Sequence, residues 1–316
     1  MTKYSLSPLS FDNLKTIPIA DRGGKVRPAD FGRPHSRGAS LIDNLPHILA
    51  ADSLRAVIEA IVQARARRRR VIAGMGGHVI KCGLAPILLD LARRGYITAF
   101  AMNGSAAIHD FEIAIAGATS EDVEAVLPDG RFGSAEETGR EMNTAIAEGA
   151  RDGIGWGESL GRRLAAIAQP EFAPFSLLHQ AYAAAIPVTV HVAIGTDTPH
   201  THPAVDAAAL GQATHHDFRL FSALVAELND GGVYLNIGSA VVMPEVFLKA
   251  VSSVRNLGYP LAGFTTANFD FLQHYRPTQN VVKRPHANAG GHGYAITGHH
   301  EIMIPLLAAA LVERDR

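Results

Sequence analysis

The sequence predicts an α/β fold in which a doubly wound, mostly parallel sheet carries helices on both faces. Three observations support this prediction. Short apolar runs, such as residues 71–73 and 187–194, alternate with longer stretches in which apolar residues recur at helical spacing. Glycine or small polar residues separate each run from the helix that follows. Polar side chains gather directly after the runs, and in a parallel sheet these turns all lie at the carboxyl edge of the strands.

The composition is typical of a soluble protein with one large domain. The chain has 316 residues, of which 47% are hydrophobic, and this is enough for a sizeable core. A net charge of −1 argues against nucleic acid or a membrane surface as a partner. The single cysteine, Cys82, excludes an internal disulfide and fits a reducing compartment, and we expect a small core residue there. Without a visible signal peptide or an apolar segment of about 20 residues, the sequence predicts a cytoplasmic protein.

The chain divides into an N-terminal arm, residues 1–40, and a single domain, residues 41–316. The arm is rich in proline, glycine and arginine, and we expect its segments 22–25 and 33–38 to lie on the surface or on a partner subunit. One or two helices are predicted over 41–66. Residues 120–170 interrupt the alternation, with a helix over 134–148 that starts at a capping box of Ser134 and Glu137. They predict a helical insertion, or lid, over one edge of the sheet.

The first two strand–turn–helix units set the pattern for the chain. A strand at 71–73 is followed by Gly74, Gly76 and Gly77 and then by one helix from Val79 to Leu91. A strand at 97–102, a turn at 103–105 and a helix at 106–116 repeat this order. Such turns suit a phosphate, because the free N–H groups and the dipole of the helix point there. The glycines do not match the GxGxxG register, so a tight turn without a nucleotide stays an open alternative.

The remaining elements continue the pattern, with strands at 187–194, 232–237, 261–266 and 294–296 and helices at 160–167, 175–185, 217–228, 244–257 and 305–311. Polar residues after five of the strands are predicted to line the carboxyl edge, where ligands of doubly wound sheets bind. They are Asn103, Ser105, His109, Thr196, Asp197, His200, His202, Asn236, Ser239, Asn268, Asp270, His274, His299, His300 and Glu301.

Two groups of side chains would support different chemistries at this edge. A zinc site needs about three ligands beside an open position, and these could come from His200, His202, His299 and Glu301. Histidine is equally suited to hydrogen-bond a sugar or a carboxylate, so a metal-free site stays open as well. Lys283 could form an imine with a carbonyl substrate if it is desolvated, or it could be a plain surface charge.

Short strings spread over residues 40–312 follow the pattern of a known family. They are Ala73-Gly74, Ile80-Lys81-Cys82, Asp197 after an apolar strand, Gly238-Ser239-Ala240-Val241-Val242, Thr266-Ala267, Arg276-Pro277 and Ile304-Pro305-Leu306-Leu307. In these strings the chain resembles deoxyhypusine synthase. The resemblance has departures: the family's Trp-Gly-Lys is absent, and Lys283 falls near that position only if a gap of two residues is allowed.

Other side chains of the family are also replaced. Gly77 and His78 stand in place of a carboxylate pair, His299 in place of an aspartate, and Pro244-Glu245 in place of a histidine pair. Several carboxylates that would surround a polyamine are therefore missing, and we expect the substrate to have changed. The additional histidines favour an anionic or hydroxylated ligand.

The resemblance implies a Rossmann-like fold that binds NAD and a homotetramer with active sites at subunit interfaces. The implied reaction is an NAD-dependent transfer, in which an amine is oxidised and passed through a lysine imine to an acceptor that can be a protein. The implied nucleophile is Lys283, with His200, Glu245 and His300 as acid–base or substrate-orienting groups. The implied NAD-binding residues are Gly74, Gly76, Gly77, Asn103, Ser105, Asp197, Gly238, Ser239 and His299.

We therefore expect a divergent NAD-dependent transferase of the deoxyhypusine synthase type that acts on an amine-type or altered small substrate. Two alternatives stay open. One is a metal-dependent hydrolase or lyase built on His200, His202, His299 and Glu301. The other is a catalytically inactive ligand-binding protein of the same fold.

Overall fold

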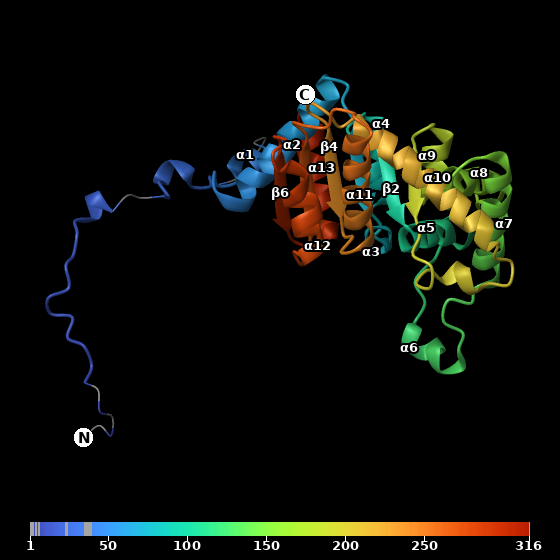
Figure 1. Ribbon diagram of the computed structural model, residues 1–316, viewed down its shortest axis with the longest axis horizontal. Helices are drawn as coiled ribbons and strands as arrows, with labels where there is room; N and C mark the ends of the chain where they lie inside the picture. Colours follow the sequence, from blue (N-terminus) through green and yellow to red (C-terminus); the bar gives the residue numbers. More distant parts are fainter. Residues whose placement is uncertain (1–2, 4, 6, 23–24, 35–39, 316) are drawn as a thin grey trace.

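The computed structural model describes residues 3, 5, 7–22, 25–34 and 40–315, and within them six parallel strands form one sheet (Figure 1). Across the sheet the strands lie in the order β3-β2-β1-β4-β5-β6. The order reverses between β1 and β4, which makes this the doubly wound, Rossmann-like α/β fold that the sequence predicts. The strands are β1 (Val71–Met75), β2 (Ala99–Asn103), β3 (Val188–His191), β4 (Val233–Ile237), β5 (Thr265–Asp270) and β6 (His292–Thr297).

Helices cover both faces of the sheet and its β3 edge (Figure 1). One face carries α2 (Leu49–Ala66), α4 (Ala85–Arg93), α5 (Gly104–Ala116) and α13 (His300–Glu313). The opposite face carries α10 (Ala207–Ala226) and α11 (Val242–Asn256). Near β3 lie α7 (Glu136–Asp152), α8 (Trp156–Ile167) and α9 (Leu177–Ala183). Short helices are α1 (Leu41–Asn44), α3 (Gly77–Lys81), α6 (Val123–Val126), α12 (Tyr275–Pro277) and the π-helix η6 (Thr278–Lys283).

Alternate residues of β1 face opposite layers of the core, and both layers are apolar because the strand is buried on its two faces. Ala73 and Met75 pack with the helices of the first face, and Ile72 packs with Tyr234 on the other. Gly74 shares the side of Tyr234, where a Cβ would lie 2.4 Å from the hydroxyl oxygen of this tyrosine. Gly74 is therefore part of the strand and makes room for a ring, which corrects its place in the predicted turn.

The helix predicted from Val79 to Leu91 is interrupted. In the structure α3 ends at Lys81, and α4 begins only at Ala85. Gly83 has a φ of +70° between them, a conformation that glycine adopts without strain. Pro86 lies in the first turn of α4, where its missing N–H costs nothing. Apolar residues recur at helical spacing on both sides of Gly83 and Pro86, so the periodicity alone did not reveal the break.

Two other boundaries differ from the prediction. Strand β5 begins at Thr265, four residues after the expected start at 261, so Asn268 and Asp270 belong to the strand and not to the loop behind it. Helix α10 begins at Ala207, ten residues before the expected start. Asp206 caps it by accepting hydrogen bonds from the N–H groups of Ala208 and Ala209, each at 3.0 Å.

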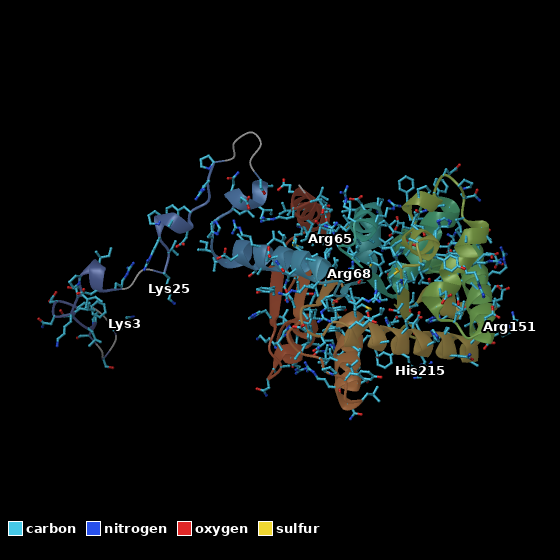
Figure 2. The ribbon with its side chains drawn as sticks, turned by 90° about the horizontal axis from the view of Figure 1, so that it is seen from above. Lys3, Lys25, Arg65, Arg68, Arg151 and His215 are labelled. Carbon is cyan, nitrogen blue, oxygen red and sulfur yellow. The ribbon has the colours of Figure 1, made fainter. Side chains whose placement is uncertain are left out.

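The described part of the arm runs away from the sheet, with Lys3 and Lys25 along its length (Figure 2). The predictions for residues 23–24 and 35–38 lie outside the described residues. Within 120–170, α7 and α8 pack near the β3 edge, whereas α6 stands apart from the sheet (Figure 1). Helix α7 starts after Ala135, which makes no side-chain cap, so the predicted capping box at Ser134 is wrong. None of the helices in the described ranges has the length and apolar character to cross a bilayer.

Candidate functional site

The turns after β1, β2 and β4 touch one another at the carboxyl edge of the sheet. The N–H of Gly76 donates a hydrogen bond to the carbonyl of Ile237 at 3.0 Å, and a Cβ on Gly76 would lie 2.2 Å from the carbonyl oxygen of Gly238. A Cβ on Gly77 would lie 2.2 Å from the hydroxyl oxygen of Ser105. These two glycines are required by the close approach of three turns, which brings their N–H groups to the edge where the strand order reverses.

His300 lies buried beneath the turn after β4. Gly238 has a φ of +61°, and a Cβ there would lie 2.9 Å from Cε1 of His300. Nε2 of His300 donates to the carbonyl of Phe269 at 3.1 Å, which makes Nδ1 the basic nitrogen. Burial lowers the pKa of His300, so the ring is neutral. Nδ1 is buried and has no hydrogen-bond partner among the described residues.

A row of amides supports the same turn from within the sheet. Asn236 in β4 stands opposite Asn268 in β5, and its amide nitrogen donates to the side-chain oxygen of Asn268 at 2.7 Å. The same nitrogen donates to the carbonyl of Ser239 at 2.9 Å. The hydroxyl oxygen of Ser239 accepts a hydrogen bond from the N–H of Met243 at 3.2 Å. Ser239 thus holds the first turn of α11, while its hydroxyl proton stays able to bind a ligand.

Asp197 follows β3 and faces the start of α5. Its side chain is buried, and its Oδ2 accepts a hydrogen bond from the N–H of Ala193 at 2.9 Å. Burial raises the pKa of Asp197. A Cβ on Gly104 would lie 2.2 Å from Oδ2 of Asp197, so the carboxylate stands against the first residue of the helix. Asn103 caps this helix by accepting from the N–H of Ala106 at 2.9 Å, which is a structural role for a residue predicted to bind NAD.

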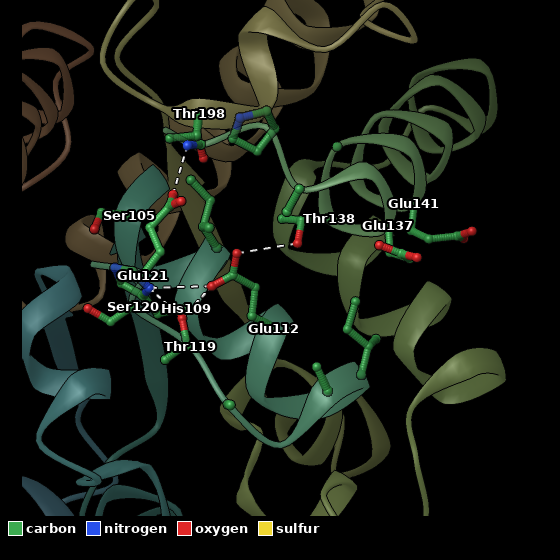
Figure 3. Close-up of a pocket in the computed structure, with 18 of the residues that line it drawn as sticks. Ser105, His109, Glu112, Thr119, Ser120, Glu121, Glu137, Thr138, Glu141 and Thr198 are labelled. Carbon is green, nitrogen blue, oxygen red and sulfur yellow. Dashed lines mark hydrogen bonds and ion pairs between the residues drawn. The ribbon is translucent and has the colours of Figure 1, made fainter. Parts of the chain in front are cut away.

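A cavity of about 950 Å³ opens beside Ser105 and Asp197 (Figure 3). It lies between α5, the loops around α6, the start of α7 and the segment after β3. The other predicted NAD-binding residues do not line it. The charged residues in its wall are Lys81, Glu112, Glu121, Glu137, Arg140, Glu141 and Asp197. Five carboxylates against two cations make this an acidic cavity, which no pattern in the sequence indicates.

The centre of the cavity wall is a network around Glu112. Nδ1 of His109 donates to the hydroxyl oxygen of Thr119 at 2.7 Å, and this hydroxyl in turn donates to Glu112. Thr138 donates to the other oxygen of the same carboxylate at 3.3 Å. Burial would raise the pKa of Glu112, but the nearby His109 and the hydrogen bonds from Thr119 and Thr138 outweigh it and lower the pKa. Glu112 therefore holds a fixed negative charge, and Nε2 is the basic nitrogen of His109.

The four residues of the predicted zinc site do not come together. Nε2 of His202 lies 3.1 Å from Glu136 on α7, whereas His299 stacks on Phe271 with ring centroids 6.2 Å apart. His200 stands edge-on to Trp156, and neither of its ring nitrogens has a partner among the described residues. Among these residues, the ligand atoms of His200, His202, His299 and Glu301 form no common centre. The alternative of a metal centre built on these four residues is therefore wrong.

Lys283 lies away from the carboxyl edge. It is exposed and ends the π-helix η6, whose Val281 accepts from the hydroxyl of Thr266 at 2.6 Å. A Cβ on Gly293 would lie 1.9 Å from the carbonyl oxygen of Val282. Thr266 and Gly293 are the second residues of β5 and β6, so Lys283 lies near the amino ends of these strands. At about 3.3 Å per residue, the six residues of β6 separate it from the carboxyl edge by roughly 15 Å.

Glu245, a predicted acid–base group, stands in the first turn of α11 and is already paired. Its Oε1 accepts from Arg276 at 2.9 Å and from Asn280 at 3.0 Å. These bonds fasten the connection between β5 and β6 to α11. The structure therefore gives Glu245 a structural role and separates Lys283 from the rest of the predicted site. Neither the pairing of Glu245 nor the position of Lys283 could be predicted, because local sequence patterns do not give the path of this connection.

Comparison with known proteins shows the fold. No protein-family model matches the chain, and no curated protein matches it. A solved LOR/SDH-type protein from Methanococcus maripaludis S2 is 16% identical, with a TM-score of 0.51 over 90% of this chain and 74% of that one. AgrE, crystallised with ornithine and NAD+, is 15% identical, with a TM-score of 0.51 over 86% of this chain and 35% of that one.

A protein from Entamoeba histolytica assigned as a deoxyhypusine synthase is 10% identical, with a TM-score of 0.46 over 83% of this chain and 87% of that one. The chain thus spans about a third of the length of AgrE and most of the length of the other two. The two structures with a TM-score of 0.51 agree with a Rossmann-like α/β fold and do not single out deoxyhypusine synthase.

Proposed function

We propose that this protein is an NAD-dependent enzyme that acts on a small amine-bearing substrate. The dinucleotide would lie along the carboxyl edge of β4, β1 and β2, and the substrate would enter the acidic cavity beside it. The observation that carries the proposal is the row of contacts along this edge, where Gly238 meets Gly76 and Ser105 meets Gly77 at the reversal of the strand order.

The groups at this edge suit a dinucleotide. The N-terminus of the 13-residue helix α5 offers N–H groups and a partial positive charge to a phosphate beside Ser105. Asp197 stands next to that helix start and can accept a hydrogen bond from a ribose hydroxyl. His300, whose ring packs against the Gly238 turn and whose Nδ1 has no partner among the described residues, can accept one more hydrogen bond.

The cavity suits a cation. Glu112 keeps its charge within the wall, and four further carboxylates outnumber the two cations. An ammonium group bound there would gain charge-assisted hydrogen bonds to these oxygens. AgrE, which shares the fold, was crystallised with ornithine, an amine-bearing amino acid, together with NAD+. This pairing supports an amine as the substrate class.

The residues of the cavity can bind and deprotonate such a substrate. NAD, when bound, supplies the hydride acceptor for oxidation of the carbon that carries the nitrogen. Glu112 would orient the ammonium group, and His109 would accept its proton at Nε2, since Nδ1 is engaged by Thr119. His109 also lies beside the turn proposed to hold the dinucleotide, because a Cβ on Gly77 would be 3.2 Å from its Cδ2.

Lys283 is left out of this proposal because it lies near the amino ends of β5 and β6. Transfer through an imine on Lys283 would require this residue to enter the site of another subunit. We further propose that the protein is a homotetramer, that its acceptor can be a protein, and that residues 120–170 form a lid. Sedimentation of the purified full chain tests the tetramer directly.

Calorimetric titration of NAD into the full chain tests the proposal. Ser105→Asp places a negative charge at the start of α5, where the helix dipole favours it but a phosphate is repelled. We expect it to lower NAD affinity at least tenfold, equivalent to about 1.4 kcal/mol. Ser252→Asp, at an exposed position of α11, is the matched control and should leave the affinity unchanged. No binding to the unmodified chain, or equal loss in both variants, would contradict the proposal.

A further inference from the structure

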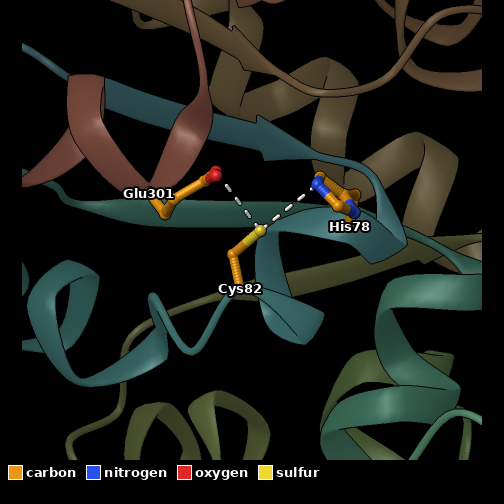
Figure 4. A group of neighbouring side chains, drawn as sticks. All are labelled: His78, Cys82 and Glu301. Carbon is orange, nitrogen blue, oxygen red and sulfur yellow. Dashed lines mark hydrogen bonds between the residues drawn. The ribbon is translucent and has the colours of Figure 1, made fainter.

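A cysteine, a histidine and a glutamate converge near the carboxyl edge, on the side of the α13 helix (Figure 4). Sγ of Cys82 lies 3.2 Å from Nε2 of His78 and 3.7 Å from Oε2 of Glu301. One ligand atom from each of the three residues lies within 4.8 Å of the others. Cys82 is half-buried, and His78 and Glu301 are exposed, so the group is open to solvent.

The fold brings these residues together from two ends of the chain. His78 and Cys82 are four residues apart on α3 and its C-cap, and this spacing puts them on one face of a helical turn. Glu301 lies in the first turn of α13, directly after β6. The helix break at Gly83 ends α3 immediately after Cys82 and leaves the thiol at its end.

We infer that His78, Cys82 and Glu301 form a site for a divalent cation of the zinc class. Zinc binds sulfur at about 2.3 Å and nitrogen or oxygen at about 2.0–2.2 Å in tetrahedral geometry, so neighbouring ligand atoms lie about 3.5 Å apart. The separations of the Cys82 sulfur from Nε2 of His78 and from Oε2 of Glu301, 3.2 and 3.7 Å, lie on either side of this value. Three protein ligands and an open side leave the fourth position for a water molecule or a substrate.

The charges of the site match a divalent cation. A thiolate and a carboxylate carry two negative charges, and the neutral imidazole adds none. A free thiol has a pKa of about 8.5, so near pH 7 the sulfur holds its proton when no metal is bound. Binding then forms the sulfur–metal bond and releases this proton to the solvent. His299, whose Nδ1 lies 3.8 Å from Oε1 of Glu301, is placed to orient the carboxylate.

This site differs from the alternative quartet of His200, His202, His299 and Glu301, and it lies beside the proposed NAD site, since the ring centroids of His78 and His300 are 5.6 Å apart. It shares only Glu301 with the former, and its other two ligands were expected to be a replaced carboxylate and a core residue. A thiolate, absent from that quartet, favours zinc over magnesium or calcium. The two sites share no ligand residue, so titration with metal in the absence of NAD tests the metal site alone.

Titration of the untagged full chain with Zn²⁺ and Co²⁺ tests the inference. We expect one metal ion per chain, with about one proton released, measured calorimetrically in two buffers of different ionisation enthalpy. The Co²⁺ form should show a near-ultraviolet sulfur-to-cobalt charge-transfer band. Cys82→Ser should abolish this band, since Cys82 is the only cysteine. His78→Ala and Glu301→Gln should each weaken Zn²⁺ binding at least tenfold, the lower end of what even second-shell changes cost.

His215→Ala is the matched control, because His215 is an exposed histidine on α10 (Figure 2). It should bind Zn²⁺ as the unmodified chain does. The exposed positions of His78 and Glu301 make their variants compatible with the fold, and circular dichroism checks this. A Co²⁺ complex without the charge-transfer band would overturn the inference, as would unchanged Zn²⁺ affinity in Cys82→Ser or in both exposed-ligand variants.

Discussion

Gly76 and Gly238 lie backbone against backbone at the point where the strand order of the sheet reverses. A Cβ on Gly76 would lie 2.2 Å from the carbonyl oxygen of Gly238, and the N–H of Gly76 donates to Ile237 at 3.0 Å. The contact joins the turn after β1 to the turn after β4. In doubly wound sheets the ligand crevice opens at this point, so the contact fixes the floor of the proposed NAD site.

Gly76→Ala is expected to destabilise the protein by about 1–3 kcal/mol, because the added methyl meets a backbone that neighbouring strands hold in place. It should also weaken NAD binding, since the two turns must move apart. Gly211→Ala is the control: a Cβ there meets nothing within 4 Å, and α10 should gain up to about 1 kcal/mol from the better helix former. Urea unfolding of both variants measures the difference. Equal stability of the two would show that the turns are not in rigid contact.

Glu112→Gln is expected to weaken binding of an amine such as ornithine about tenfold, equivalent to about 1.4 kcal/mol, because glutamine keeps hydrogen-bonding groups but loses the charge. NAD affinity should stay unchanged. Glu148→Gln on α7, outside the cavity wall, is the control. Competition calorimetry in the presence of NAD measures both. Unaltered amine affinity in Glu112→Gln would show that the amine does not bind in this cavity.

The stability of the protein should fall as the pH rises toward neutrality. Burial raises the pKa of Asp217 from its ordinary value of 3.8 to about 7, although its Oδ2 accepts from the N–H groups of Gly157 and Val190 at 2.9 and 2.8 Å. Between these two pH values the folded protein holds a proton that the unfolded chain has released. The free energy of unfolding should therefore decrease over this window, by up to about 1.4 kcal/mol per pH unit, and level off above it.

Asp217→Asn tests this assignment, because its amide oxygen can accept the same two hydrogen bonds without titrating. Its free energy of unfolding should fall less steeply between about pH 5 and pH 7 than that of the unmodified protein. A smaller slope in the same direction should remain, since burial raises the pKa of Asp110 to about 6. Parallel pH profiles of the two proteins would show that Asp217 is ionised in the fold.

Lys283→Ala should leave NAD binding and NAD-dependent amine oxidation unchanged within twofold, about 0.4 kcal/mol. The residue is exposed and lies near the amino ends of its strands, away from the proposed site. Lys249→Ala, an exposed lysine on α11, controls for the loss of a surface charge. Loss of activity in Lys283→Ala alone, together with a substrate adduct trapped on Lys283 by borohydride, would contradict this prediction. It would instead support the lysine imine that the resemblance to deoxyhypusine synthase implies.

Much of the fold could be predicted from the sequence because the strands are short, apolar and followed by small residues. The boundaries failed where one residue changes the local geometry, as Gly83 does within an apolar period that continues across it. Strand β5 was shifted because Asn268 and Asp270 are polar yet buried, which a hydrophobicity pattern assigns to a loop. Their burial depends on partners in β4 and α13 that are distant in the sequence.

Only the location of the candidate site, at the carboxyl edge of the sheet, could be predicted from the sequence. The topology of a parallel sheet brings the turns after its strands to one edge. Gly76, Gly77 and Gly238 lie at this edge, as the rule predicts. The cavity depends on how residues 117–141 fold back over α5, and Cys82 was taken for a core residue because Glu301 is 219 positions away. Neither relation leaves a local signal. The sequence therefore predicts at which edge of the sheet a ligand binds, whereas the side chains that surround this ligand are identified only in the structure.

Hydrogen exchange with and without NAD, read by mass spectrometry of peptides, locates the dinucleotide on the sheet. We predict that NAD slows exchange in residues 74–82, 103–109 and 237–243, which contain the turns after β1, β2 and β4. No change is expected in residues 284–291, which precede β6 at the amino ends of the strands. Protection confined to 284–291, or no protection anywhere at saturating NAD, would contradict a dinucleotide at the carboxyl edge.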